Sequence, residues 1–258
     1  HAARSAVVGA MFYPPELHLD DAPALDVLAV AAHPDDIEQT CGGALLKMAE
    51  AGYSTGALDL TAGEMGTRGT PELRIEESRE AARILQIKFR ENLRMPDARL
   101  ENSLPLRLTL ATVLRRLKPR VLVLPYWEAR HPDHAVASTL AIEAAFIGGI
   151  RKMDADSEPH RPFKVVYASL YANVTPSFVV DITGQFERRM ESLFAYHSQY
   201  DEQSDGAGLF PKREEIHDRL RSIARFYGNL IGVKYGEPYV VKETFRVDDL
   251  VTLGVRSF

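Results

Sequence analysis

The sequence predicts an α/β protein with a Rossmann-like, doubly wound and mostly parallel sheet flanked by helices. Short apolar runs alternate along the chain with helical patterns of about 10 to 15 residues, which is typical of β-α-β units. Two of the runs, residues 25–32 and 121–125, are almost entirely apolar, as expected for strands covered on both faces. A loop with a His-Pro pair follows each of them. In such a fold the ligand crevice lies beyond the carboxyl ends of the strands, so we expect both loops to border it.

The strands are predicted from apolar runs that end at loop-forming residues. In chain order they cover residues 25–32, 55–62, 89–97, 121–125, 164–171 and 177–182. Helical segments join the first three strands, which predicts parallel neighbours.

Apolar residues three and four positions apart predict the helices. Gly42 opens the first helix, and Thr70 and Pro71 supply the N-cap and first-turn proline of the second. Pro119 ends the third helix, and the glycine pair at 148–149 ends the fourth. The apolar faces run through Leu45–Ala49, Ile75–Leu85, Leu106–Leu117, Val136–Ile147, Phe186–Phe194 and Ile216–Tyr227.

We expect a single domain over residues 21–258. The chain has 258 residues, 45% of them hydrophobic and 26% charged, so it is long and apolar enough to bury a core. The polar, proline-containing stretch 151–162 indicates a surface connection or a small insertion. Residues 1–20 are interpreted as an N-terminal arm or a tag remnant, with the remnant of a cleaved secretory segment as the alternative.

Charge and cysteine content exclude several classes of function. Lys and Arg number 31 against 36 Asp and Glu, a net charge of −5, so there is no excess of basic residues for binding nucleic acid. Cys41 is the single cysteine and cannot form an internal disulfide. No apolar run reaches the ~18 residues of a membrane span. We therefore predict a cytoplasmic protein with no nucleic-acid or membrane partner, acting on a small polar molecule.

The two His-Pro loops carry a predicted metal site. One reads HPDD and the other HPDH, and each tetrapeptide is expected by chance in roughly one chain per thousand of this length. We predict that His33 and Asp36 of the first loop and His134 of the second bind one divalent ion. Two imidazoles, one carboxylate and an open fourth position are the pattern of a catalytic zinc site, so the expected cofactor is one Zn²⁺ per subunit.

Three further residues of these loops are predicted to act around the ion. Asp35 is the candidate general base, because a carboxylate beside a metal-activated water can take its proton; the alternative is a carboxylate that only caps a helix. His131 either stabilises an oxyanion or gives a proton to a departing amine. Asp133 is interpreted as an N-cap or as a partner that orients a histidine.

Residues outside the loops are candidates for contacts with substrate. Arg74 lies in the first turn of a predicted helix, where a cation is unfavourable, so its position indicates an anionic or carbonyl-rich ligand. The alternative is a solvated side chain paired with Glu77 or Ser78. Asp97 is a candidate acceptor for a sugar hydroxyl or a simple turn residue. The polar stretch 196–200 is either a wall of the pocket or a helix C-cap.

At this point the sequence resembles the LmbE/PIG-L family of zinc-dependent N-acetylglucosaminyl deacetylases. The shared motifs are AHPDD-x-E, at residues 32–38, and HPDH, at residues 131–134. Segments GTPELR and YHSQ also fit, and the resemblance runs from about Leu25 to Gln199. Within the family the chain is most similar to the bacterial enzymes that deacetylate the GlcNAc-malate precursor of bacillithiol. Homo-oligomers are common in the family, so we expect one here.

The resemblance implies a role for each matching residue. The implied zinc ligands are His33, Asp36 and His134, the base is Asp35, the residue that supports the intermediate is His131, and the substrate contacts are Arg74, Glu64 and Asp97. The predicted function is removal of the acetyl group from an N-acetylglucosamine-containing small molecule such as GlcNAc-malate, with release of acetate and a free amine.

Several other functions remain open at this stage. A thiol-conjugate amidase or a chitooligosaccharide deacetylase would use the same metal site. A non-catalytic, metal-dependent sugar-binding module would keep the ligands but need neither Asp35 nor His131. A dinucleotide-binding protein is disfavoured, because the first strand leads into HPDD and not into a G-x-G-x-x-G turn.

Overall fold

The described part of the chain folds around one mixed sheet. The computed structural model describes residues 19, 22–153, 157–169, 173–201 and 211–255. In this part, seven strands pair in the order β3-β2-β1-β4-β5-β7-β6. They are β1 (Val27–Ala31), β2 (Thr55–Thr61), β3 (Phe89–Met95), β4 (Val121–Pro125), β5 (Lys164–Ala168), β6 (Phe178–Asp181) and β7 (Gly236–Val240). All pairs among the first five strands are parallel, and β7 runs antiparallel to β5 and β6, so the predicted α/β fold is confirmed.

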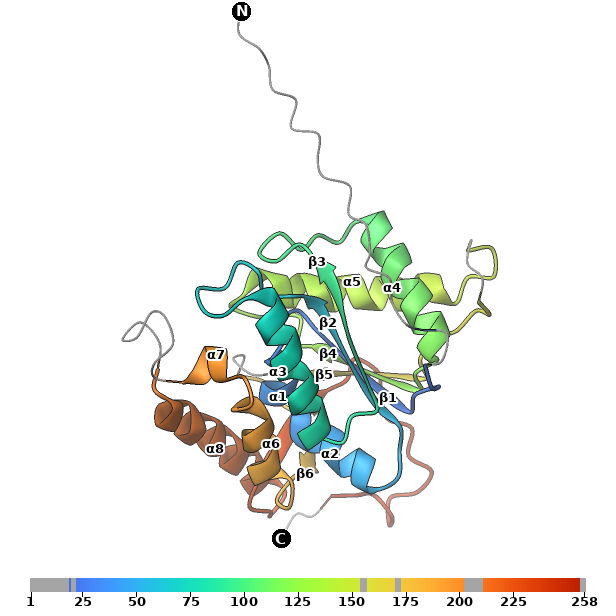
Figure 1. The fold of residues 1–258 in the computed structure, drawn as a ribbon. Coiled ribbons are helices and arrows are strands. Elements are labelled where there is room, and N and C mark those ends of the chain that lie inside the picture. Colours follow the sequence, from blue (N-terminus) through green and yellow to red (C-terminus); the bar gives the residue numbers. More distant parts are fainter. Residues whose placement is uncertain (1–18, 20–21, 154–156, 170–172, 202–210, 256–258) are drawn as a thin grey trace, which may run out of the picture.

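Helices cover both faces of this sheet (Figure 1). They are α1 (Asp36–Thr40), α2 (Gly42–Glu50), α3 (Pro71–Ile84), α4 (Leu104–Leu117), α5 (Pro132–Gly148), α6 (Phe186–Leu193), α7 (His197–Tyr200) and α8 (Arg213–Leu230). Side chains of β1 alternate between the faces, as the two-residue period of a strand requires. Leu28 and Val30 pack with α4 and α5, whereas Ala29 and Ala31 pack with α1 and α2. The small alanines leave room for the short helix that carries part of the site.

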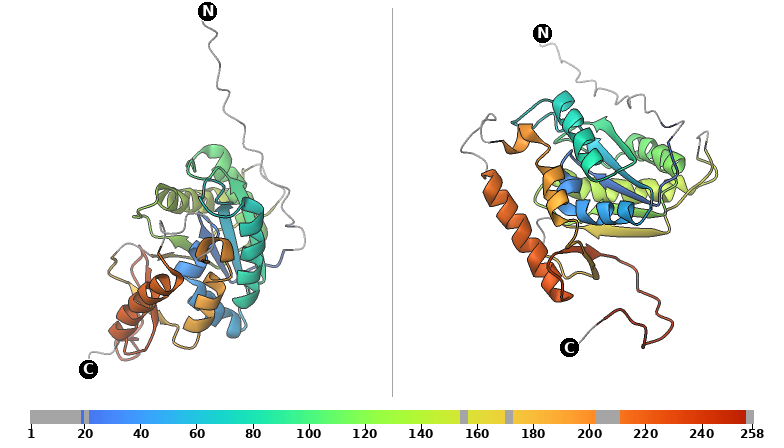
Figure 2. Two further views of the ribbon diagram at one scale, coloured as in Figure 1. Left: turned by 60° about the vertical axis from the view of Figure 1, so that its left-hand side comes forward. Right: turned by 60° about the horizontal axis from the view of Figure 1, so that its bottom comes forward.

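The C-terminal part differs from the prediction in one element. Sequence analysis assigned no strand after Gln199, yet β7 lies between β5 and β6. Its sequence GEPYV contains Glu237 and Pro238, residue types that are rare in strand interiors, so its local pattern does not indicate a strand. The strands predicted at 164–171 and 177–182 are therefore separated by a segment from far along the chain. Figure 2 shows α8 and the segment after it on one side of the molecule.

The structure describes the predicted N-terminal arm and the predicted insertion only in part. Residues 1–20, the predicted arm or tag remnant, lie outside the described residues except for Leu19. The stretch 151–162 joins α5 to β5, and its residues 154–156 also lie outside. Buried Arg115 donates hydrogen bonds to the carbonyls of Gly148 and Ser157, which ties this connection to α4. The single domain over 21–258 stays a prediction. None of the helices in the described residues is long and apolar enough to cross a membrane.

Candidate active site

The two His-Pro loops meet where β1 and β4 end. These strands are parallel neighbours in the middle of the sheet, so the segments that follow them emerge at the same edge. His33 lies just beyond β1, and His134 lies in the first turn of α5, which follows β4. Their ring nitrogens Nδ1 and Nε2 are 3.3 Å apart, although the residues are 101 positions apart in sequence.

Asp36 completes a triangle of possible metal ligands. Its Oδ2 lies 3.3 Å from Nδ1 of His33 and 3.1 Å from Nε2 of His134. Bonds of about 2.0–2.1 Å to a tetrahedral zinc ion would separate the ligand atoms by about 3.3 Å, so the three donors fit one ion. Burial raises the pKa of Asp36, but the neighbouring imidazoles outweigh it and hold this pKa well below its ordinary value. The carboxylate is therefore ionised, which is the form that binds a metal.

Two carboxylates orient His33 from its other side. Nε2 of His33 lies 3.1 Å from Oδ1 of Asp97 and 3.4 Å from Oδ2 of Asp133. Both carboxylates are buried and held in turn by backbone amides, since Met65 donates to Asp97 and Ala98 donates to Asp133. Hydrogen bonding at Nε2 leaves Nδ1 to face a metal, which is the usual support for a ligating histidine.

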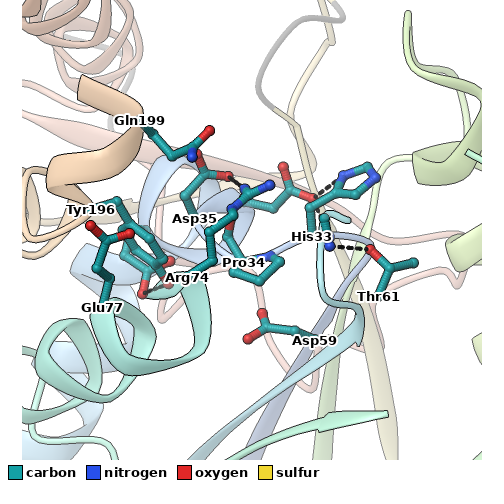
Figure 3. Close-up of polar contacts among 12 residues, drawn as sticks. His33, Pro34, Asp35, Asp59, Thr61, Arg74, Glu77, Tyr196 and Gln199 are labelled. Atoms are coloured by element: carbon teal, nitrogen blue, oxygen red, sulfur yellow. Dashed lines mark hydrogen bonds and ion pairs between the residues drawn. The ribbon is translucent and has the colours of Figure 1, made fainter. Parts of the chain in front are cut away.

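Asp35 projects into the same space from a strained backbone position. Its φ is 97°, in the left-handed region that is costly for a residue with a Cβ, and such strain is concentrated at functional sites. Tyr200 donates a hydrogen bond of 2.7 Å to Oδ2 of Asp35. Nη2 of Arg74 lies 3.6 Å from Oδ1 of Asp35, and Figure 3 shows these two side chains next to each other. Burial raises the pKa of Asp35 to about 6, because desolvation outweighs the attraction of Arg74.

The Arg74 side chain is buried in the wall of the site and is not solvated. It extends from the first turn of α3 and donates a hydrogen bond of 2.6 Å to the carbonyl of Pro34. Gly63 has a φ of 67°, and a Cβ there would lie 1.9 Å from Nη1 of Arg74, so a larger residue would strain the backbone and displace the guanidinium group. The alternative pairing with Glu77 is wrong: the Glu77 carboxylate accepts hydrogen bonds of 2.7 Å from the amide and hydroxyl of Ser198.

His131 lies at the N-terminus of α5 beside the ligand triangle. Its Nδ1 accepts a hydrogen bond of 3.3 Å from the amide of Asp133, and its ring centre is 4.6 Å from that of His33. Burial and the neighbouring imidazoles lower the pKa of His131. In the neutral ring with Nδ1 as acceptor, Nε2 carries the proton, so His131 presents an N–H donor.

A cavity of about 480 Å³ brings these groups together. The residues on its wall are His33, Asp35, Asp36, Gln39, Met65, Gly66, Thr67, Arg68, Arg74, Asp97, Ala98, His131, His134, Gln199, Tyr200, Pro211, Ile216 and Arg219. The predicted stretch 196–200 thus contributes to the wall. Arg74 and Asp97 line this cavity, whereas Glu64, the third predicted substrate contact, does not. The Glu64 carboxylate instead accepts a hydrogen bond of 2.7 Å from the amide of Asp97.

Sequence analysis gave no individual role to Tyr200, Arg68 or Arg219, which all lie in this wall. Tyr200 belongs to the polar stretch 196–200, which was predicted as a possible wall, whereas no pattern indicated Arg219. Arg68 donates a hydrogen bond of 2.7 Å to the carbonyl of Gln199, so it also holds that stretch against the loop after β2.

A buried ion-pair network joins α1 to β2 and β3. Glu38 and Arg90 form an ion pair, and Arg90 also donates to Asp59 at 3.0 Å and to the hydroxyl of Tyr196 at 2.8 Å. The Glu38 side chain is fully buried. Burial raises the pKa of Asp59 to about 6. Because one cation joins three elements, the network holds α1, and with it Asp36, against β2 and β3.

A second buried cluster reaches α1 and α2 from the C-terminal strand. Glu237 of β7 accepts hydrogen bonds of 2.8 and 2.7 Å from the amides of Gly43 and Ala44, at the N-terminus of α2. Arg189 lies 3.4 Å from Glu237 and donates to the carbonyls of Glu38 and Gln39. A buried anion at a helix N-terminus is favourable, so β7 helps to fix the helices behind the ligands.

Comparison with known proteins assigns the chain to a family. The PIG-L family model, described as GlcNAc-PI de-N-acetylase, matches residues 28–145. A diacetylchitobiose deacetylase of Thermococcus kodakarensis is 30% identical over 226 residues, which are 82% of this chain and 80% of that protein. The chain belongs to the PIG-L family. This membership confirms the predicted class of enzyme, an N-deacetylase.

Solved structures agree with this assignment. The conserved protein TT1542 from Thermus thermophilus superposes with a TM-score of 0.79 at 41% identity, covering 87% of this chain and 98% of that one. The N,N'-diacetylchitobiose deacetylase of Pyrococcus horikoshii superposes with a TM-score of 0.72 at 29% identity, covering 83% and 82%. Both solved structures therefore share the overall fold of this chain.

Proposed function

We propose that this protein is a zinc-dependent deacetylase that removes acetyl from an N-acetylglucosamine-containing small molecule, releasing acetate and a free amine. The observation that carries the proposal is the triangle of His33, Asp36 and His134 donors, 3.1 to 3.3 Å apart, beside the Asp35 carboxylate. Membership of the PIG-L family supports it. The donors suit zinc, although other divalent ions accept similar ligands.

Different side chains of the cavity carry out the separate steps of amide hydrolysis. A bound zinc ion would polarise the acetyl carbonyl and make water more acidic. Asp35 accepts a proton as water adds to the carbonyl carbon, and the Nε2–H of His131 donates a hydrogen bond to the developing oxyanion. Asp35 then returns the proton to the sugar nitrogen as the C–N bond breaks. The hydrogen bond from Tyr200 orients the carboxylate for both transfers.

Exposed Arg219 on the cavity wall supports a substrate that also carries carboxylates, such as GlcNAc-malate. Arg68 and Arg219 lie on the wall together with Arg74, and guanidinium groups recognise carboxylates with paired hydrogen bonds. A second candidate substrate is a chitooligosaccharide, favoured by the similarity to the two diacetylchitobiose deacetylases. A cytoplasmic location and assembly into homo-oligomers belong to the same proposal.

The test is acetate release by zinc-loaded protein from N-acetylglucosamine, GlcNAc-malate, GlcNAc-inositol and diacetylchitobiose, with the metal content measured on the same sample. We expect one zinc per chain and the highest kcat/KM on GlcNAc-malate. Arg219→Gln should raise KM for GlcNAc-malate by about tenfold, the value of one charged hydrogen bond, and leave KM for N-acetylglucosamine unchanged. Arg221→Gln, an exposed arginine on the same helix, is the matched control. No acetate from any substrate would contradict the proposal.

A further inference from the structure

A second, smaller cavity of about 30 Å³ adjoins the ligand triangle. Of the described residues, Asp36 and His134 alone line both this recess and the large cavity. The recess extends from these two side chains toward the carboxyl ends of β4 and β5. Its lining is Val30, Ala31, Asp36, Ile37, Thr40, Cys41, Val123, Leu124, Pro125, Tyr126, Glu128, Ala129, His134, Ala168 and Ser169.

The deep wall of the recess is apolar, in contrast to the large cavity. Ala31, Ile37, Val123 and Ala168 are all buried there. Cys41 is also buried, and burial raises the pKa of its thiol above the neutral range, so it behaves as a small apolar side chain. The large cavity instead presents charged groups and hydrogen-bond donors.

We infer that this recess is the acyl subsite, which receives the methyl group of the acetyl chain. The inference rests on the proposed function. An amide carbonyl carbon held at the ligand triangle has a polar substituent, the sugar nitrogen, and an apolar one, the methyl group. The polar cavity of about 480 Å³ suits the sugar, and the apolar recess suits the methyl group.

The size of the recess limits the acyl chain that it accepts. A cavity of about 10–15 Å³ holds one water molecule, so a recess of about 30 Å³ has room for a methyl or ethyl group but not for a longer chain. Burying a methyl group there is favourable, whereas a propyl group must displace packed strand residues. The structure therefore assigns acyl-length selectivity to residues of β1, β4 and β5.

The first experiment measures kcat/KM on glucosamine substrates that carry N-acetyl, N-propionyl or N-butyryl groups. We expect propionyl, whose ethyl group still fits, to stay within about tenfold of acetyl, and butyryl to be slower than acetyl by about 100-fold, since one methylene too many changes discrimination by roughly 10- to 200-fold in an apolar pocket. Equal values for acetyl and butyryl would overturn the inference.

The second experiment alters the recess with a matched control. Val123→Ala lengthens the space and should raise the butyryl-to-acetyl ratio of kcat/KM by about tenfold. Val166→Ala is the control, because Val166 pairs with Val123 across β4 and β5 in the same apolar cluster but does not line the recess. The same change of ratio in both variants would overturn the inference, since it would then report general loosening of the core.

A binding measurement separates this inference from the proposed function. If wild-type protein releases no acyl group from any of the three substrates, the proposed function fails. The recess is then judged by saturation-transfer NMR of acetate and butyrate on the zinc-loaded protein. Acetate should receive stronger saturation than butyrate, and Ala168→Val, which fills the recess, should weaken acetate binding by about tenfold. Unchanged acetate binding in that variant would overturn the inference.

Discussion

The ligand loops and the C-terminal wall of the site are built in different ways. The ligands lie in two short motifs at the ends of the neighbouring strands β1 and β4. Residues of α7 and α8 form this wall, and β7 holds the N-terminus of α2. The contacts span long stretches of chain: Tyr200 contacts Asp35 over 165 positions, and Glu237 contacts Gly43 over 194. The loops carry the predicted ligands and base, whereas the C-terminal residues position them. Substitutions in the loops should therefore reduce zinc content or kcat strongly, and substitutions in the C-terminal part should have smaller effects on kcat or lower the free energy of unfolding.

The largest effect is expected from a ligand. His134→Ala removes one of the three donors, so zinc content should fall below one per chain and kcat/KM should drop by roughly a thousandfold or more. Metal analysis of the purified protein and acetate release measure the two effects. His197→Ala, an exposed histidine of α7, should change neither quantity. Full zinc content in His134→Ala would remove this residue from the ligand set.

The next effect concerns the base. Asp35→Asn keeps the shape of the side chain but cannot accept a proton, so kcat should fall by about 10²- to 10⁴-fold while zinc stays bound. Single-turnover acetate release and metal content together test this separation. Asp218→Asn, at an exposed aspartate of α8, is the control. Normal turnover in Asp35→Asn would exclude it as the base.

A smaller effect is expected where the wall meets the loop. Tyr200→Phe removes the hydrogen bond to Oδ2 of Asp35 but keeps the ring, so kcat should fall by about tenfold with zinc content unchanged. Tyr53→Phe, at an exposed tyrosine, should leave kcat unchanged. An effect of Tyr200→Phe on KM alone would show that the hydroxyl contacts substrate and does not orient the base.

The smallest kinetic effect is expected from the buried support. Glu237→Gln leaves Arg189 without its anionic partner and weakens the cap on α2, so the free energy of unfolding should fall by about 3 kcal/mol. Denaturant unfolding measures this change, and kcat on the folded protein should stay within about twofold of wild type. A large loss of kcat without loss of stability would give β7 a direct part in catalysis.

The strands that carry the ligand loops could be predicted from sequence, whereas the C-terminal strand could not. The strand runs 25–32 and 121–125 were predicted as β1 and β4, since burial on both faces leaves a strong apolar pattern. β7 was not predicted, because its position depends on pairing with β5 and β6 and not on its own residues. Arg74 was predicted in part. Its helix was predicted from local sequence, but its burial beside Asp35 was not, because that burial depends on packing against the loop at Gly63.

The sequence by itself determined the residue types of the site and their places at the ends of two strands, because motifs, turns and apolar periodicity are local properties of the chain. Only the tertiary structure decided that Asp97 and Asp133 face the far nitrogen of His33, that Tyr200 holds Asp35, and that an apolar recess adjoins the ligands. The physical reason is that side-chain contacts and cavities arise from packing between segments far apart in sequence.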